Sequence, residues 1–154
     1  MSCRRVIVMM VMLAASVGVG AQKAAKPPVA VNPLAAAQTL HCAFTSYAVT
    51  GWKDGTSMTV TADETFAFDI AVVNLKKSRG RVIGAQASAD ATVVLTPTGM
   101  NVIEQTLLGN FLLTTVFTSG AADGRFLAIH SRHVGDLATA PSPSQHYGTC
   151  RITK

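Results

Sequence analysis

The sequence lacks the short motifs by which many enzyme families are recognised. It contains no glycine-rich phosphate loop, no dinucleotide fingerprint and no paired-carboxylate pattern. Ser131 with a neighbouring histidine and Asp136 comes nearest to a nucleophile set, but it lacks the sharp glycine-flanked turn that exposes a catalytic serine. We therefore expect a protein that binds rather than one that catalyses, and one that needs no cofactor.

The chain also lacks an apolar run long enough to remain as a membrane anchor. The run at residues 6–19 has fourteen residues, whereas a membrane-spanning helix needs about 20. Two arginines precede this run, and residues 19–21 supply the small side chains of a cleavage site. We interpret residues 1–21 as a signal peptide. A mature chain that begins at Gln22, without a membrane span and exported to the periplasm or beyond the cell, is the expected product.

Cysteine is scarce, with three in the whole chain. Cys3 leaves with the signal peptide, so Cys42 and Cys150 remain in a chain that enters an oxidising compartment. Each of the two alternates in phase with apolar neighbours, so both are expected to face the core of their strands. The sequence predicts one disulfide, between Cys42 and Cys150.

Clustered charge is scarce as well. The formal net charge of +5 falls to +3 when the two signal-peptide arginines are removed, and the one basic cluster is at residues 76–81. Nucleic-acid binding usually shows as clustered cations with interleaved aromatic residues. We therefore expect no nucleic-acid partner. The expected partner is a small ligand or an extracytoplasmic protein, and the expected oligomeric state is a monomer.

Residues 22–38 are rich in proline and alanine and show no sustained period, which predicts a flexible leader. The folded domain is then residues 39–154. Alternating apolar residues and turn signals every eight to twelve residues are typical of short antiparallel strands. The expected strands lie at residues 40–49, 57–61, 65–73, 81–87, 92–96, 100–108, 111–117, 125–133 and 147–153, with a turn at 51–55 and a polar loop at 135–145.

This pattern predicts an all-β fold, a single antiparallel β-barrel of about eight strands, with a two-sheet β-sandwich as the alternative. A barrel is favoured because the predicted disulfide would join the first and last strands, which are neighbours in a closed barrel. The predicted core contains Phe66, Phe68, Ile70, Phe111, Leu113, Phe117 and one of Phe126 and Leu127.

The segment at residues 130–133 is the predicted ligand-binding rim, because a strand that begins apolar ends there in two histidines and an arginine. The candidate residues are His130, Arg132, His133, His146 and Trp52. His130 and His133 are three apart on a strand and so face opposite sides, which argues against a metal site. His133 and His146 flank one loop and could meet.

Two functional hypotheses follow. A small barrel can hold one small or apolar ligand, whereas its rim loops can grip another protein, as in an inhibitor of an extracellular enzyme or an envelope scaffold. Arg132 is either a donor to the ligand or a structural partner of Glu104 or Asp136. Glu104 shares a face with Met100 and Val102, which places it near a barrel end or opposite an arginine.

Overall fold

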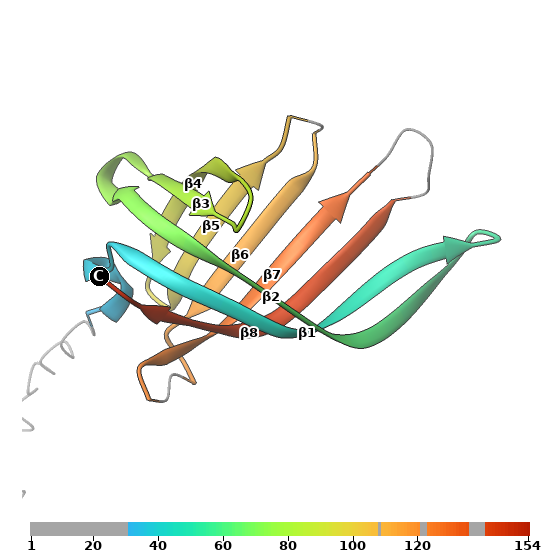
Figure 1. Cartoon of the computed structure of the whole chain (residues 1–154), viewed down its shortest axis with the longest axis horizontal. Coiled ribbons are helices and arrows are strands. Elements are labelled where there is room, and N and C mark those ends of the chain that lie inside the picture. Colours follow the sequence, from blue (N-terminus) through green and yellow to red (C-terminus); the bar gives the residue numbers. More distant parts are fainter. Residues whose placement is uncertain (1–30, 108, 121–122, 136–140) are drawn as a thin grey trace, which may run out of the picture.

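The computed structural model describes residues 31–107, 109–120, 123–135 and 141–154 (Figure 1). The predicted signal peptide, its cleavage site and residues 22–30 of the predicted leader lie outside the described residues. Two short 3-10 helices and eight strands make up the described chain: η1 (Pro33–Ala36), β1 (Thr39–Lys53), β2 (Thr56–Asn74), η2 (Leu75–Lys77), β3 (Arg79–Ile83), β4 (Ser88–Thr96), β5 (Gly99–Gln105), β6 (Phe111–Phe117), β7 (Arg125–Val134) and β8 (Ser142–Ile152).

Every strand pairs antiparallel with its neighbour in the sequence, and β8 pairs back with β1 (Figure 1). The eight strands therefore form one closed ring of hydrogen bonds, and the arrangement is barrel-like. The prediction of an all-β antiparallel fold of about eight strands is confirmed. Because side chains alternate along each strand, one set faces the interior of the ring and the other faces solvent.

The β1–β2 hairpin is longer than predicted. The separate strands expected at residues 57–61 and 65–73 are one strand, β2, and the turn expected at 51–55 narrows to Asp54 and Gly55. Both turn residues have positive φ, 52° and 76°, as a two-residue hairpin loop requires. Asp63 and Glu64 interrupt the apolar alternation between the two expected strands, but the strand continues there because Ala62 and Asp63 pair with β1. Strand β8 likewise begins at Ser142, inside the expected loop.

A β-bulge in β1 changes which residues face the ring interior. The register shifts between Phe44 and Ser46 against both neighbouring strands, β2 and β8. One extra residue in a strand reverses the alternation beyond it. Phe44 and Tyr47, three residues apart, consequently lie on the same inner face, and both contact aromatic rings there.

The core fills the interior of the ring. Its fully buried apolar members include Leu40, Phe44, Ile70, Met100 and Val116, and Leu34 of η1 joins them from the N-terminal side. Residues 31–38 are therefore attached to the ring. Leu34 lies in its core, and Asn32 donates hydrogen bonds to the carbonyls of Thr96 and Gly99. Both hydrogen bonds tie this segment to the β4–β5 turn.

The predicted core is right for β2 and wrong for β6. Phe68 and Ile70 are buried and Phe66 packs against them, as expected. On β6, however, Thr114 and Val116 are buried, whereas Phe111 is 42 % exposed. Both faces of β6 are apolar in sequence, so its orientation is set by the neighbouring strands. Of the two candidates on β7, Phe126 is buried and Leu127 is half exposed.

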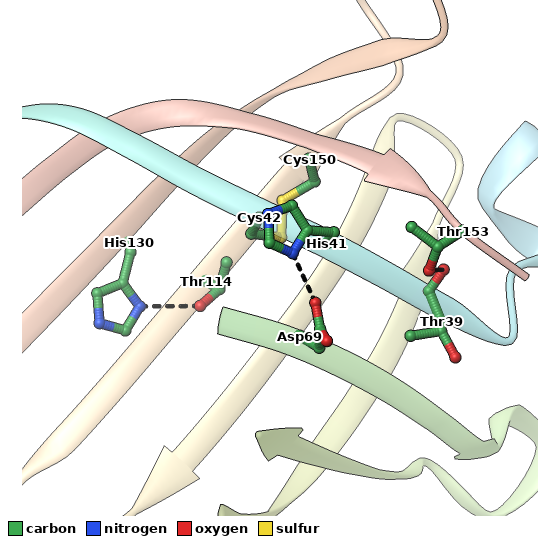
Figure 2. Close-up of a disulfide and its surroundings, with 8 residues drawn as sticks. All are labelled: Thr39, His41, Cys42, Asp69, Thr114, His130, Cys150 and Thr153. Carbon is green, nitrogen blue, oxygen red and sulfur yellow. Dashed lines mark hydrogen bonds and ion pairs between the residues drawn. A yellow bond between two sulfur atoms is a disulfide. The ribbon is translucent and has the colours of Figure 1, made fainter. Parts of the chain in front are cut away.

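Cys42 and Cys150 form a disulfide, as predicted (Figure 2). They lie directly opposite each other on β1 and β8, the pair of strands that closes the ring. Just beyond them Gly148 lies opposite Phe44, where a Cβ atom would collide with the backbone of Ala43 and Phe44. The closing seam therefore needs a glycine at this position.

On the outer face of β1 and β2, the His41 Nδ1–H donates a hydrogen bond to Asp69 Oδ1 over 2.7 Å (Figure 2). This contact joins β1 to β2 from the solvent side. Asp69 thus lies on the outer face of β2, where its carboxylate accepts a hydrogen bond from a histidine.

Candidate ligand site in the ring interior

Two histidines lie side by side on the inner face of the ring. The pairing of β5 to β8 with β1 and β2 aligns one inward-facing row, here called the histidine row: Val102, Thr114, His130, His146, Tyr47 and Ala62. His130 is 4 % exposed and His146 is 3 % exposed, and their ring centroids are 5.9 Å apart. Residues sixteen apart in the sequence are brought together because β7 and β8 are adjacent.

Aromatic rings surround both imidazoles. The His130 ring lies 5.3 Å from the Phe68 ring and 5.8 Å from the Phe44 ring, measured between centroids. The His146 ring stacks on Tyr47 at 5.3 Å and meets the edge of Phe66 at 4.7 Å. Such an environment has little polarity with which to stabilise an imidazolium ion.

Hydrogen bonding satisfies these histidines only in part. His130 Nδ1 and Thr114 Oγ1 are 2.9 Å apart and form a hydrogen bond between β7 and β6 (Figure 2). His146 Nε2 lies 3.4 Å from Ser144 Oγ, and its Nδ1 is buried without a partner among the described residues. A buried ring nitrogen without a partner costs free energy, so this arrangement is not optimised for stability alone.

Burial lowers the pKa of both histidines. Burial, the neighbouring His146 and the Arg132 guanidinium together lower the pKa of His130 to about 4. Burial and Arg132 also lower the pKa of His146, although Glu64 acts against them. Both imidazoles are therefore neutral at pH 7. A neutral ring nitrogen can accept or donate one hydrogen bond, depending on the tautomer.

Glu104 faces inward from β5 and is also buried, at 8 % exposed. Burial raises the pKa of its carboxyl group. No ion pair or hydrogen bond to its side chain is found among the described residues, and the arginine partner considered from the sequence is absent there. Asp136, the other partner considered for Arg132, lies outside the described residues.

A cavity of about 280 Å³ opens beside these groups, between β2 and the β3–β4 turn. Its apolar walls include Phe68, Val82 and Leu112, and its buried polar groups are Glu104 and His130. Larger hollows lie on the outer surface. One of them, about 710 Å³, is lined by exposed side chains such as Arg79, Arg81 and Asp90. The inner cavity is the candidate site because both of its titratable groups are buried.

The structure does not bring all five predicted site residues together, although Arg132 and His133 line one hollow of about 370 Å³. His130, His146 and Arg132 belong to the inner face, and Arg132 is exposed at the end of β7 next to the two histidines. His133 and Trp52 line a separate outer hollow of about 400 Å³ with Pro141 and Pro143. His133 contacts Phe111 at 6.3 Å between ring centroids.

Sequence reasoning omitted several residues that line the inner cavity. Leu112 and Val82 carried no signal beyond strand alternation. Glu104 did carry a signal, because it is in phase with the apolar residues of β5, but that signal indicated an arginine partner and not a ligand. Phe68 was expected in the core and not in a site.

Among the residues that the structure describes, no group of three or more His, Cys, Asp or Glu side chains could hold a metal ion. Within the same described ranges, no helix is both long and apolar enough to cross a membrane. Comparisons with protein-family models, with curated proteins and with solved structures find no match to this chain.

The lowered pKa of His130 predicts that the protein loses stability in mild acid. As the pH falls below 6.5, the unfolded chain binds a proton at this histidine and the folded chain does not until about pH 4. Between pH 6.5 and 4.5 the free energy of unfolding should fall by about 2–3 kcal/mol from this group. Urea unfolding at the two pH values measures it.

His130→Gln, which keeps a hydrogen-bonding group for Thr114, serves as the comparison. The raised pKa of Glu104 acts in the opposite direction in both proteins and cancels in the difference. An equal pH dependence in wild type and variant would show that His130 titrates normally.

Proposed function

We propose that this chain is an exported, non-enzymatic binding protein that holds one small, mainly apolar ligand in the inner cavity. The observation that carries the proposal is the lining of that cavity, which combines apolar side chains with two buried polar groups, Glu104 and His130. Both groups can form hydrogen bonds beyond the one between His130 and Thr114. Ligand sites typically combine such walls with a few convergent polar groups.

The dimensions of the cavity limit the ligand. Typical small-molecule sites have volumes of about 300–1,000 Å³, and this one, at about 280 Å³, lies just below that range. A ligand with one aromatic ring and a short polar arm suits it better than a long lipid. The disulfide between Cys42 and Cys150 is compatible with export to an oxidising compartment.

Filling the cavity should abolish binding. Leu112 lies half-buried on the inner face of β6 and lines the cavity, and Leu113 lies half-buried on the outer face of the same strand. We expect wild-type protein and Leu113→Trp to bind 2-phenylethanol with a Kd of about 1 mM or lower, as measured by isothermal titration calorimetry. Leu112→Trp should weaken binding at least tenfold.

Thermal unfolding of both tryptophan variants shows whether the fold survives. The proposal fails if wild type binds neither 2-phenylethanol nor 2-phenylethylamine, or if the two variants bind equally well.

A second candidate, a protein-binding module, is favoured by one other feature. Strand β2 pairs with β3 only from Asp69 onward, so residues 56–68 have one edge without a strand partner among the described residues. Met58 and Val60 on this segment are more than half exposed. An extended segment of another protein could add to this edge as a further strand. Slow amide exchange along 56–68 on addition of a protein partner would favour this candidate, whereas a cavity ligand would leave that edge unchanged.

A further inference from the structure

The carboxyl group of Glu104 points to the chemistry of the ligand. It belongs to a residue that is 8 % exposed, and it lines the cavity beside Leu112 and Val82. Carboxylates are rarely buried without a paired cation or several hydrogen bonds. Here neither is found within the described part of the chain.

The cation nearest to Glu104 in the register does not pair with it. Glu104 lies opposite Leu112, which in turn lies opposite Arg132, so the leucine separates the two charged residues across the inner face. Burial is the cause of the raised pKa of Glu104, with no lowering by a neighbouring positive charge. The cavity thus offers a carboxyl group for which the described part of the chain supplies no partner.

The other groups near the cavity are compatible with a cation. His130 is neutral at pH 7, so it does not repel one, and its free ring nitrogen can accept a hydrogen bond. Glu64 acts on the pKa of His146 as a negative charge, which offsets the positive charge of Arg132. A ligand cation would therefore leave the interior close to electrically neutral.

We propose that the ligand carries a protonated primary amine, which pairs with the Glu104 carboxylate while the apolar body of the ligand packs against Phe68, Val82 and Leu112. This inference rests on the proposed function, because it names the ligand class of the same cavity. Pairing with an ammonium group in a site of low polarity stabilises the carboxylate form and supplies charge-assisted hydrogen bonds. A neutral alcohol of the same shape gains no such pairing.

Two matched probes test the inference at pH 7: 2-phenylethylamine, which is protonated, and 2-phenylethanol, which has the same ring and arm. Wild type should bind the amine at least tenfold more tightly, as measured by isothermal titration calorimetry. Glu104→Gln keeps the shape of the side chain and removes its charge, so it should reduce amine affinity at least tenfold and abolish the preference for the amine over the alcohol.

Asp123→Asn is the control for net charge. It removes one negative charge from an exposed turn where the residue has a φ of 51°, which asparagine tolerates. This variant should keep the wild-type preference for the amine. Unfolding curves of both variants confirm that each is folded at the temperature of the titration.

The outcomes separate the two claims. If both probes bind wild type equally, or if Glu104→Gln keeps the preference for the amine, the amine inference is overturned and the cavity takes neutral ligands, with Glu104 as a protonated donor. If neither probe binds, the proposed function itself fails. If Asp123→Asn loses the preference as Glu104→Gln does, the effect is one of overall charge and the inference is also overturned.

Discussion

Replacing Phe44 by alanine should lower the free energy of unfolding by about 3–5 kcal/mol, as measured by urea denaturation. Phe44 is 1 % exposed, and its ring stacks on those of Phe66 and Phe68 at 4.9 Å and 5.4 Å between centroids. It also contacts His130.

Phe111→Ala is the matched control for this substitution. Phe111 is 42 % exposed on the outer face of β6, so its removal should cost about 1 kcal/mol or less. A larger cost for Phe111 than for Phe44 would mean that β6 faces the other way and that the description of the core is wrong.

Removing the disulfide should have an effect of similar size. The bond closes a loop between residues 108 positions apart, and the chain-entropy model gives about 4–5 kcal/mol for such a loop, as an upper figure. The double variant with Cys42→Ala and Cys150→Ala should therefore unfold at a markedly lower urea concentration than the oxidised wild type. Wild type in a reducing agent should approach the variant.

Thiol labelling checks the premise of this experiment. Oxidised wild-type protein, unfolded without a reducing agent, should take up no label at Cys42 or Cys150. Labelling at either position, or identical unfolding curves for the oxidised and reduced protein, would show that the bridge does not contribute in the way described.

Local patterns were sufficient to predict the disulfide and most of the strands, although they divided β2 in two and placed the start of β8 too late. Alternation at Phe66, Phe68 and Ile70 identifies the inner face of β2 because the other face carries only small or charged residues, Ala67, Asp69 and Ala71. Cys42 and Cys150 each alternate in phase with the apolar residues of their own strand, so both were expected to face the core. This agreement implied that the two strands are neighbours. β6 gave no such asymmetry, since Leu112 and Val116 on one face are matched by Leu113 and Phe117 on the other. Its orientation depends on pairing with β5 and β7, which is a long-range property.

The candidate site was predicted only in part, for similar reasons. The sequence predicted His130 and His146 as candidate ligand-binding residues. Their proximity to each other depends on the register of β7 with β8, which the sequence does not reveal. The bulge after Phe44, which turns Tyr47 toward His146, has no marker in the sequence. Glu104 becomes a candidate ligand-binding residue only because a cavity lies between it and the β3–β4 turn.

Native mass spectrometry of the wild type, Leu112→Trp and Leu113→Trp tests the central claim most directly. Each protein is purified in the same way, and spectra are recorded after addition of 2-phenylethanol and, separately, of 2-phenylethylamine. We expect wild type and Leu113→Trp to carry one extra noncovalent mass, and Leu112→Trp to appear at its bare mass. A wild type that stays bare with both probes, or an equal extra mass on Leu112→Trp, would contradict a ligand site in the ring interior.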